Sequence, residues 1–168
     1  LFRSADAGDT WETLYTEFPF DLGAPEDVHE FGCGGDIKPY PHPEISGTVF
    51  ASVCYCDNLG SGLIKSTNHG ETWKPFMEGI DDPYITALSF HPENPDIMVV
   101  GTAHGMIYKS VDGGDYWEPL VDQPMNYIGL VMFNSHEPYE LWIAGEFMGK
   151  YTDDKFTEWK EIPSPTDE

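Results

Sequence analysis

The sequence predicts an all-β fold built from repeated antiparallel units. Short apolar runs recur about every eight to twelve residues, and segments rich in glycine and proline separate them. No segment shows the apolar period of an amphipathic helix. One turn motif also returns along the chain, and a motif that recurs at a fixed period is typical of repeat architectures.

The clearest example of the turn motif lies in a hairpin predicted over 107–120. Two β-prone runs flank the sequence Ser-Val-Asp-Gly-Gly at 110–114, whose residues favour a tight turn. Asp112 can accept hydrogen bonds from N–H groups of the turn, and Gly114 can adopt a positive φ at little steric cost. Trp117 can then fold back over the turn as an apolar lid.

The motif occurs in four copies, which begin at residues 4, 66, 110 and 152. The steps between the last three copies fit the roughly 40–45 residues of a four-stranded propeller blade. Asn68 replaces the acid in the second copy, and Phe156 stands where the fourth copy should have its glycine. The positions expected to be structural are Ser4, Asp6, Gly8, Trp11, Ser66, Asn68, Gly70, Trp73, Ser110, Asp112, Gly114, Trp117 and Trp159.

This Ser-x-Asp-x-Gly-x-Thr-Trp pattern resembles the Asp-box, or BNR, repeat of sialidases, xyloglucan-cleaving glycosidases, sortilin-type receptors and the photosystem II assembly factor. The resemblance covers nearly the whole chain. In that family the box joins the third and fourth strands of each blade, on the outer part of the wheel and away from the usual active site. The resemblance therefore implies a partial β-propeller of four-stranded antiparallel blades, three whole and one half, and says little about function.

We expect a single partial propeller over residues 1–168. Residues 1–14 form a half blade, 15–35 an insertion loop, 36–80, 81–122 and 123–162 three whole blades, and 163–168 a tail. The first blade lacks two inner strands and the chain has no initiating Met. We therefore expect that the chain is a piece of a longer propeller.

Each whole blade is expected to repeat one order of strands. The first strands, over 36–41, 84–90 and 127–133, are followed by apolar second strands over 49–54, 97–101 and 141–145. Third strands over 63–65 and 106–109 lead into the turn motif. His42 and His91 fall in equivalent His-Pro turns and His136 lies near the corresponding bend, so we expect structural roles for all three.

The chain is strongly acidic, with 30 acidic and 8 basic residues, a formal net charge of −22 and a pI near 4.2. This charge disfavours binding to nucleic acid or to an anionic membrane, because both present negative phosphates, and it leaves cationic partners or calcium open. No apolar run is long enough to span a bilayer and no signal segment opens the chain, so we expect a soluble protein without a membrane span. The acidity is compatible with a secreted or saline setting, although the compartment stays unknown.

The sequence indicates no cofactor and no metal site. Cys54 and Cys56 share one face of a predicted strand, where neighbours are poorly placed to bridge, so we interpret them as core or channel thiols. Pairing of Cys33 with either one, or metal binding by Cys33 with His29, is the alternative. The six histidines form no metal-ligand pattern.

Propeller ligands usually bind over the central channel, where the loops before the first strands meet the loops between second and third strands. Alignment of the blades places these residues there: Asp36, Cys56, Asp57, Tyr84, His104, Asn126, Tyr127 and Glu146. We predict ligand contacts from Asp57, Tyr84, His104 and Tyr127. Plain loop side chains, or packing in the core or rim, are the alternative roles.

The residue types present indicate whether the chain could belong to either of two classes of carbohydrate enzyme. A sialidase holds its substrate carboxylate with three arginines, whereas this chain has one, Arg3, on an outer hairpin, so sialidase activity is not expected. A xyloglucanase-like hydrolase needs two carboxylates across the glycosidic bond. Asp36 and Glu146 are the candidate catalytic pair, with solvated loop carboxylates as the alternative.

The residues leave two functions open. The first is a non-catalytic binding or assembly scaffold with a protein partner, as the sortilin-type receptors and the assembly factor imply. The alternative is a glycoside hydrolase-like, glycan-directed propeller with a carbohydrate partner, whose site needs further blades.

An open set of blades leaves its first and last apolar faces uncovered, with Phe133 and Trp142 expected to meet water. We therefore expect the isolated chain to form a homo-oligomer, with residues 1–20 at the joint.

Overall fold

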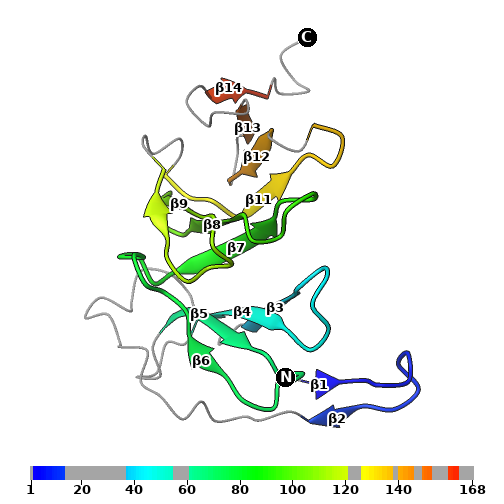
Figure 1. The fold of residues 1–168 in the computed structure, drawn as a ribbon. Helices are drawn as coiled ribbons and strands as arrows, with labels where there is room; N and C mark the ends of the chain where they lie inside the picture. The colour runs from blue at the N-terminus through cyan, green and yellow to red at the C-terminus, as the bar shows by residue number, and fades with distance from the viewer. Residues whose placement is uncertain are drawn as a thin grey trace. The chain divides into compact units, whose positions relative to one another are not determined.

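The computed structural model describes residues 2–13, 37–54, 61–120, 126–137, 140–145, 149–152 and 159–162. These residues form one two-stranded and three four-stranded antiparallel sheets, and no helix (Figure 1). In each four-stranded sheet the strands lie side by side in chain order, which is the meander of a propeller blade. The prediction of an all-β chain with three four-stranded units and one two-stranded unit is confirmed.

The strands are short, and the fourth strand is the shortest in each of the three larger sheets. The two-stranded sheet contains β1 (Phe2–Arg3) and β2 (Glu12–Thr13). The next sheet contains β3 (Ile37–Pro41), β4 (Val49–Cys54), β5 (Ser61–Ser66) and β6 (Lys74–Pro75). The third contains β7 (Ile85–Phe90), β8 (Met98–Thr102), β9 (Ile107–Ser110) and β10 (Glu118–Pro119). The last contains β11 (Leu130–Phe133), β12 (Leu141–Ala144), β13 (Gly149–Thr152) and β14 (Trp159–Glu161).

The chain divides into two compact units. Unit 1 spans residues 1–76 and holds the β1–β2 hairpin and the sheet β3–β6, whereas unit 2 spans residues 77–168 and holds the other two sheets. The expected insertion over 15–35 and the tail over 163–168 lie outside the described residues, as do Cys33 and Cys56.

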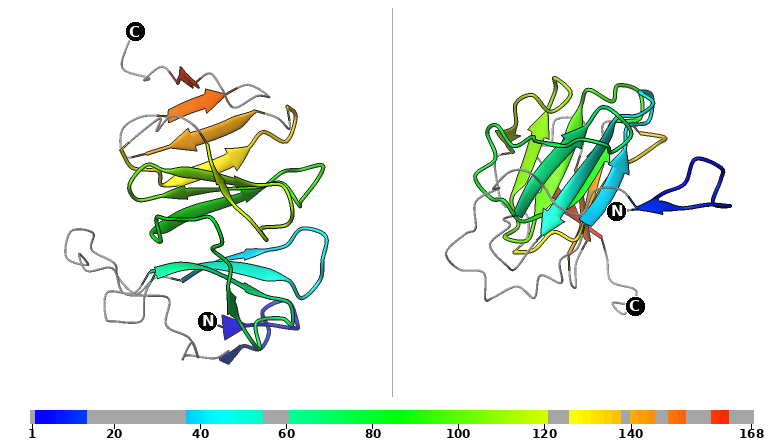
Figure 2. Two further views of the ribbon diagram at one scale, coloured as in Figure 1. Left: turned by 60° about the vertical axis from the view of Figure 1, so that its left-hand side comes forward. Right: turned by 90° about the horizontal axis from the view of Figure 1, so that it is seen from below.

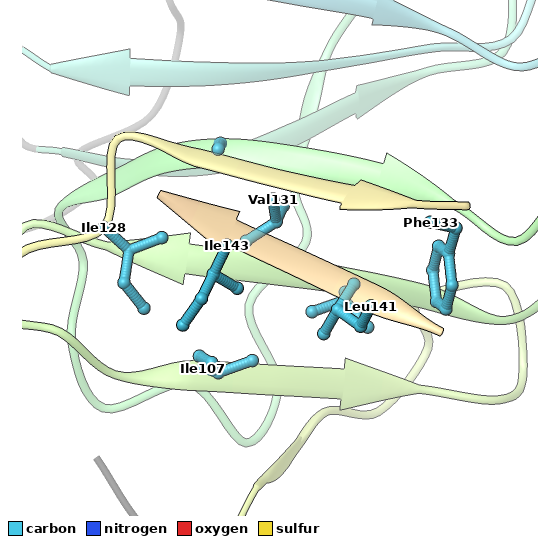
Figure 3. Packing of buried hydrophobic residues seen from close by; sticks show 8 residues of the cluster. Ile107, Ile128, Val131, Phe133, Leu141 and Ile143 are labelled. Carbon is cyan, nitrogen blue, oxygen red and sulfur yellow. The ribbon is translucent and has the colours of Figure 1, made fainter. Parts of the chain in front are cut away.

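Unit 2 buries its core between its two sheets, which lie face to face (Figure 2). Side chains from both sheets meet there, and Figure 3 labels six of them: Ile107, Ile128, Val131, Phe133, Leu141 and Ile143. Gly101 permits the close approach, because a Cβ at this position would lie 2.5 Å from Ile128 Cγ2 and 3.0 Å from Val131 Cγ1. Full burial of side chains of this size contributes roughly 1.5–3 kcal/mol each.

One side chain of the last sheet is buried where the sequence predicts exposure. Phe133 was expected to be exposed, but it is 6% exposed and packs edge-on against the buried His91 ring. Strand alternation explains the difference, because Val131 and Phe133 point into the core while Leu130 and Met132 point out and are each 48% exposed. Trp142 is half-buried, and its Nε1 donates to Glu140 Oε1.

Unit 1 has a smaller core on one face of the sheet β3–β6. It contains the buried residues Ala51, Val53, Ile64 and Trp73, with Ile37 and Val49 packed at its edge. Trp73 is the last residue of the second copy of the turn motif, so the motif and this core share one side chain.

The first three copies of the turn motif fold alike. In each, the serine Oγ accepts a hydrogen bond from the N–H of the glycine four residues later, at 2.7 Å, 2.9 Å and 2.8 Å for Gly8, Gly70 and Gly114. The same hydroxyl donates to Oδ1 of Asp6, Asn68 or Asp112. That Oδ1 accepts the backbone N–H of Thr10, Thr72 or Tyr116 at 2.8–3.1 Å.

The backbone of the turn needs two consecutive residues at positive φ. The glycines of the motif have φ of 102°, 85° and 90°. The residue before each glycine has φ of 59° at Ala7, 60° at His69 and 75° at Gly113, so only the third copy places a second glycine there. The fourth copy lies largely outside the described residues, although its ends Thr152 and Trp159 pair across β13 and β14.

The tryptophans of the motif differ in burial. Trp73 and Trp117 are 6% and 0% exposed, whereas Trp11 is 65% exposed. The Nε1 atoms of Trp11 and Trp73 donate to the carbonyls of Gly8 and Gly70, whereas the buried Nε1 of Trp117 has no hydrogen-bond partner. Trp11 therefore keeps the turn geometry without serving as a buried lid.

The turns between first and second strands share a side-chain cap. His42 Nδ1 accepts the N–H of Glu44 and Ile45, and His91 Nδ1 accepts those of Glu93 and Asn94. In the last sheet Asn134 Oδ1 accepts the N–H of His136. Asn134, rather than His136, thus occupies the capping position there. Among the capping histidines, His91 is buried, and this burial lowers the pKa of its imidazole.

Truncating the buried tryptophans should destabilise the fold selectively. We expect Trp73→Ala and Trp117→Ala each to cost roughly 3 kcal/mol or more in the free energy of unfolding, because each leaves a large cavity. Trp11→Ala is the matched control and should cost less than about 1 kcal/mol. Chemical denaturation measures all three, and equal losses at Trp11 and Trp117 would contradict the burial difference.

Acid should weaken two of the three turns. Hydrogen bonds from the side chain and backbone of Thr10 lower the pKa of Asp6 to about 2, and those from Ser110 and Tyr116 lower the pKa of Asp112. A carboxyl with a lowered pKa in the folded state stabilises that state fully above its unfolded pKa of about 4 and progressively less as the pH falls towards the folded pKa. Asn68 does not titrate, so its turn should be insensitive.

Asp112→Asn tests this pH dependence, because the amide oxygen can accept the same N–H bonds as Asn68 does. We expect the variant to keep its stability at pH 7 and to lose less than the parent chain between pH 4 and pH 2.5. Equilibrium unfolding at both ends of that range measures the difference. An unchanged pH dependence would show that Asp112 does not contribute to it.

Candidate functional site

Polar and aromatic side chains gather at one end of unit 2, where β7 and β11 begin and β8 and β12 end. Asp82 and Tyr84 precede β7, His104 lies between β8 and β9, and Tyr127 precedes β11. These positions belong to the loops in which the sequence predicts ligand contacts.

Backbone hydrogen bonds hold these loops together. Ala103 N donates to Tyr84 O at 2.9 Å, and Ile128 N donates to Thr102 O at 3.1 Å. The second bond links the segment before β11 to the end of β8 in the other sheet, beside His104. The hydroxyl of Thr86 also contacts the carbonyl oxygens of Gly101 and Ile128. Hydrogen bonds between the loops and the ends of the strands thus fix the position of these loops.

Asp82 orients the imidazole ring of His104. The His104 Nδ1 lies 3.1 Å from both carboxylate oxygens, and Asp82 Oδ1 also accepts the N–H of Tyr84 at 3.2 Å. A carboxylate only accepts, so Nδ1 carries a proton and Nε2 is the nitrogen that faces away from Asp82. The Asp82 side chain is 10% exposed and that of His104 is 47% exposed.

Two tyrosines fix the position of this pair. Tyr84 is 8% exposed, and its ring stands edge-on to the His104 ring at a centroid distance of 5.3 Å. Tyr108 is 2% exposed, and burial raises the pKa of its hydroxyl. Hydrogen bonds between this hydroxyl and the backbone of Asp82 and Asp81 act in the opposite direction and lower the pKa. Tyr84 and Tyr108 are therefore supports, and His104 is the member of the group that reaches solvent.

Tyr127 presents an aromatic surface at the same end of the unit. It is 39% exposed, and a Cβ on Gly129 would lie 3.1 Å from its ring. The missing side chain at Gly129 lets the ring lie against the backbone. An exposed tyrosine held in this way can stack on a flat apolar surface and still offer its hydroxyl for hydrogen bonds.

The structure brings some of the predicted residues together and leaves others open. Tyr84 contacts His104, and Tyr127 lies at the same end of unit 2. Asp36, Cys56, Asp57 and Glu146 lie outside the described residues. Asp82 was not predicted, although its place in the acidic pair before Pro83, directly ahead of a predicted strand, marks a residue that can cap the loop.

The described residues set limits on other chemistry. Within them, no group of three or more His, Cys, Asp or Glu side chains is arranged to hold a metal ion. The part of the chain that the structure describes also contains no helix of the length and apolarity that crossing a bilayer requires.

The chain is similar in sequence to proteins named as xyloglucanases. The chain is 29% identical over 132 residues to a probable oligoxyloglucan-reducing end-specific xyloglucanase of Neosartorya fischeri, and 29% identical over 148 residues to the xyloglucanase Xgh74A of Acetivibrio thermocellus. These alignments cover 76% and 74% of this chain but only 15% and 16% of the relatives. The chain thus spans about one-sixth of the length of the curated relatives it matches. No protein-family model matches the chain.

Solved structures show the fold. A GH74 enzyme of Niastella koreensis matches 77% of this chain and 21% of its own with a TM-score of 0.61 at 22% identity. The GH74 xyloglucanase from Xanthomonas campestris matches 73% of this chain and 22% of its own with a TM-score of 0.56 at 13% identity. YCF48 bound to D1 peptide matches 67% of this chain and 35% of its own with a TM-score of 0.51 at 15% identity. The chain is therefore part of a β-propeller.

Proposed function

We propose that this chain is a glycan-directed segment of a xyloglucanase-like β-propeller. The observation that carries the proposal is the 29% identity to proteins named as xyloglucanases, over about three-quarters of this chain. The comparisons favour the glycan-directed alternative over a non-catalytic scaffold for a protein partner. The likeness to the YCF48 complex concerns the fold, so the scaffold function stays a prediction without a specific observation behind it.

The glycan would lie against the end of unit 2 that carries His104 and Tyr127. Tyr127 would stack on one sugar ring, because aromatic faces pack well against the apolar face of a pyranose. His104 would exchange a hydrogen bond with a sugar hydroxyl, because its side chain is 47% exposed at this end of the unit. Asp82 and Tyr84 would position the imidazole without touching the sugar.

The described part of this end supplies binding groups rather than a hydrolytic pair. Hydrolysis needs two carboxylates flanking the bond, and Asp82 is buried and engaged by His104. We therefore keep Asp36 and Glu146 as the proposed catalytic carboxylates and Asp57 as a further proposed ligand contact. The turns that close on Ser4, Ser66 and Ser110 have the hydrogen bonds expected of Asp-box repeats, and we propose that identity for them.

Binding of a xyloglucan oligosaccharide tests the proposal. We expect Tyr127→Ala to weaken binding about tenfold, or ~1.4 kcal/mol, through loss of stacking. Tyr116→Ala is the matched control, because Tyr116 is also an exposed tyrosine of unit 2 but lies in the turn motif between β9 and β10. Isothermal titration calorimetry measures both variants, and equal effects at Tyr116 and Tyr127 would remove Tyr127 from the site.

His104→Asn separates a ligand contact from a structural role. The asparagine Nδ2 can still donate to Asp82, whereas the position of Nε2 is lost. We therefore expect an unchanged melting temperature together with a loss of affinity as large as that of His104→Ala. Retained affinity in His104→Asn would show that His104 only stabilises the loop. Absence of xyloglucan binding by the parent chain, alone or with its further blades, would overturn the proposed function.

A further inference from the structure

Two hydroxyl groups of β7 contact the backbone of the neighbouring sheet in unit 2. β7 and β11 are the first strands of their sheets and lie side by side (Figure 2). The Thr86 hydroxyl contacts the carbonyl oxygen of Ile128, just before β11. The Ser89 Oγ accepts the N–H of Phe133 at 3.2 Å, at the last residue of β11. One hydroxyl thus ties the two strands at the end that carries the candidate site, and the other ties them at the far end.

A β-bulge places Thr86 for this contact. Ile85 pairs with Thr102 and Ala87 pairs with Gly101, which are consecutive residues of β8, so Thr86 is the extra residue of β7. Ile85 and Ala87 are buried, whereas Thr86 is half-buried. A bulge interrupts the regular alternation of a strand and can redirect one side chain. The bulge in β7 thus lets the Thr86 hydroxyl reach the other sheet.

The Thr86 contact reinforces two backbone hydrogen bonds that hold the segment before β11. Ile128 N donates to Thr102 O at 3.1 Å, and Gly129 N donates to Ala144 O at 2.8 Å. The hydroxyl of Thr86 donates to the carbonyl oxygen of Ile128 from the opposite side of the same peptide segment. Of these three bonds, the one from Thr86 is made by a side chain, so a single substitution can remove it.

The same segment supports the ring of Tyr127. Tyr127 directly precedes Ile128, and its ring lies over Gly129, where an added Cβ would be 3.1 Å from the ring atom Cε1 and 3.6 Å from the hydroxyl oxygen. The position of the ring therefore depends on the backbone at 128–129, to which Thr86 is bonded. A ring that is already in place loses less conformational freedom on binding a ligand than a ring that must first be ordered.

We propose that Thr86 is a positioning residue for glycan binding. It holds the Ile128 carbonyl and thereby keeps the Tyr127 ring in the position from which it stacks on a sugar. This inference rests on the proposed function, because the sugar is the ligand assigned there to Tyr127. Ser89 makes the same kind of contact at the far end of β11 and is assigned no such role.

Thr86→Val tests the proposal, because it removes the hydroxyl and keeps the β-branched shape, whereas Thr86→Ser keeps the hydroxyl. We expect Thr86→Val to weaken binding of a xyloglucan oligosaccharide about fivefold, and Thr86→Ser to stay within about twofold of the parent chain. Isothermal titration calorimetry measures both variants. Parent-like affinity in Thr86→Val, or an equal loss in Thr86→Ser, would overturn the proposal.

Ser89→Ala is the matched control, because it removes the other hydroxyl that contacts the backbone of β11. We expect it to lower the melting temperature about as much as Thr86→Val does and to leave the affinity unchanged. An equal loss of affinity in Ser89→Ala would show that any weakening of the contact between β7 and β11 reduces binding. That result would overturn the specific role of Thr86.

A double-mutant cycle separates positioning of the ring from a general effect on stability. If Thr86 acts through Tyr127, then Thr86→Val should cause no further loss of affinity in a chain that already carries Tyr127→Ala. Losses that add in full would contradict the proposal.

Gly129→Ala disturbs the ring by a second route and leaves Thr86 in place. Gly129 does not have the left-handed φ that disfavours alanine, so the backbone accepts the change, while the new Cβ displaces the Tyr127 ring. We expect a loss of affinity similar to that of Thr86→Val. Parent-like affinity would show that binding does not depend on where the ring lies, and would overturn the proposal even if Thr86→Val failed to fold.

The position of the ring can also be followed without a glycan, by NMR of chains with isotope-labelled tyrosine rings. We expect Thr86→Val to shift the ring signals of Tyr127, which are identified by their loss in Tyr127→Phe, and Ser89→Ala to leave them in place. Unchanged signals in Thr86→Val would refute the positioning role. If the parent chain binds no xyloglucan, the proposed function fails, and this comparison still decides whether Thr86 positions the ring.

Discussion

A single hydrogen bond, from a glycine N–H to the Oγ of a serine four residues earlier, closes the turn in the β1–β2, β5–β6 and β9–β10 hairpins. In the β5–β6 and β9–β10 hairpins this turn joins the third and fourth strands, and the tryptophan that ends the motif is buried. Because that turn sets the register of β6 on β5 and of β10 on β9, it also decides which residues face each other across the hairpin. The pairing of Lys65 with Lys74 is therefore a consequence of the turn.

Close packing between the two sheets of unit 2 determines the geometry of the end where β7 and β11 begin and β8 and β12 end. Ile128 is buried against Gly101, and the N–H groups of Ile128 and Gly129 donate to the carbonyl oxygens of Thr102 and Ala144. Tyr127 directly precedes Ile128 in the chain. His104 follows β8, the strand whose last residue, Thr102, accepts the Ile128 N–H. The two exposed side chains of the candidate site thus depend on a glycine that neither of them contacts.

The sequence predicts features that depend on neighbours in the chain. The turn motif carries its own hydrogen-bonding groups, so its hairpins and the four-stranded order could be inferred from residue types alone. Burial of Phe133 and exposure of Leu130 could not be inferred in this way, because an alternating strand has two faces and the partner sheet decides which is covered. Trp11 and Trp117 share one motif and differ in exposure for the same reason. Likewise, Asp82 contacts a residue 22 positions later in the chain, and no local pattern announces that contact.

The outward face of β11 carries an exposed methionine, Met132, whose oxidation depends on whether this face is covered. Met132 is 48% exposed on this face, whereas Met98 is fully buried in β8 of the same unit. Mild peroxide converts accessible methionine thioethers to sulfoxides and spares enclosed ones. The ratio of oxidation at Met132 to oxidation at Met98 therefore measures how far the outward face of β11 is covered in solution. Met98 is the internal standard, because it stays protected as long as the fold is intact.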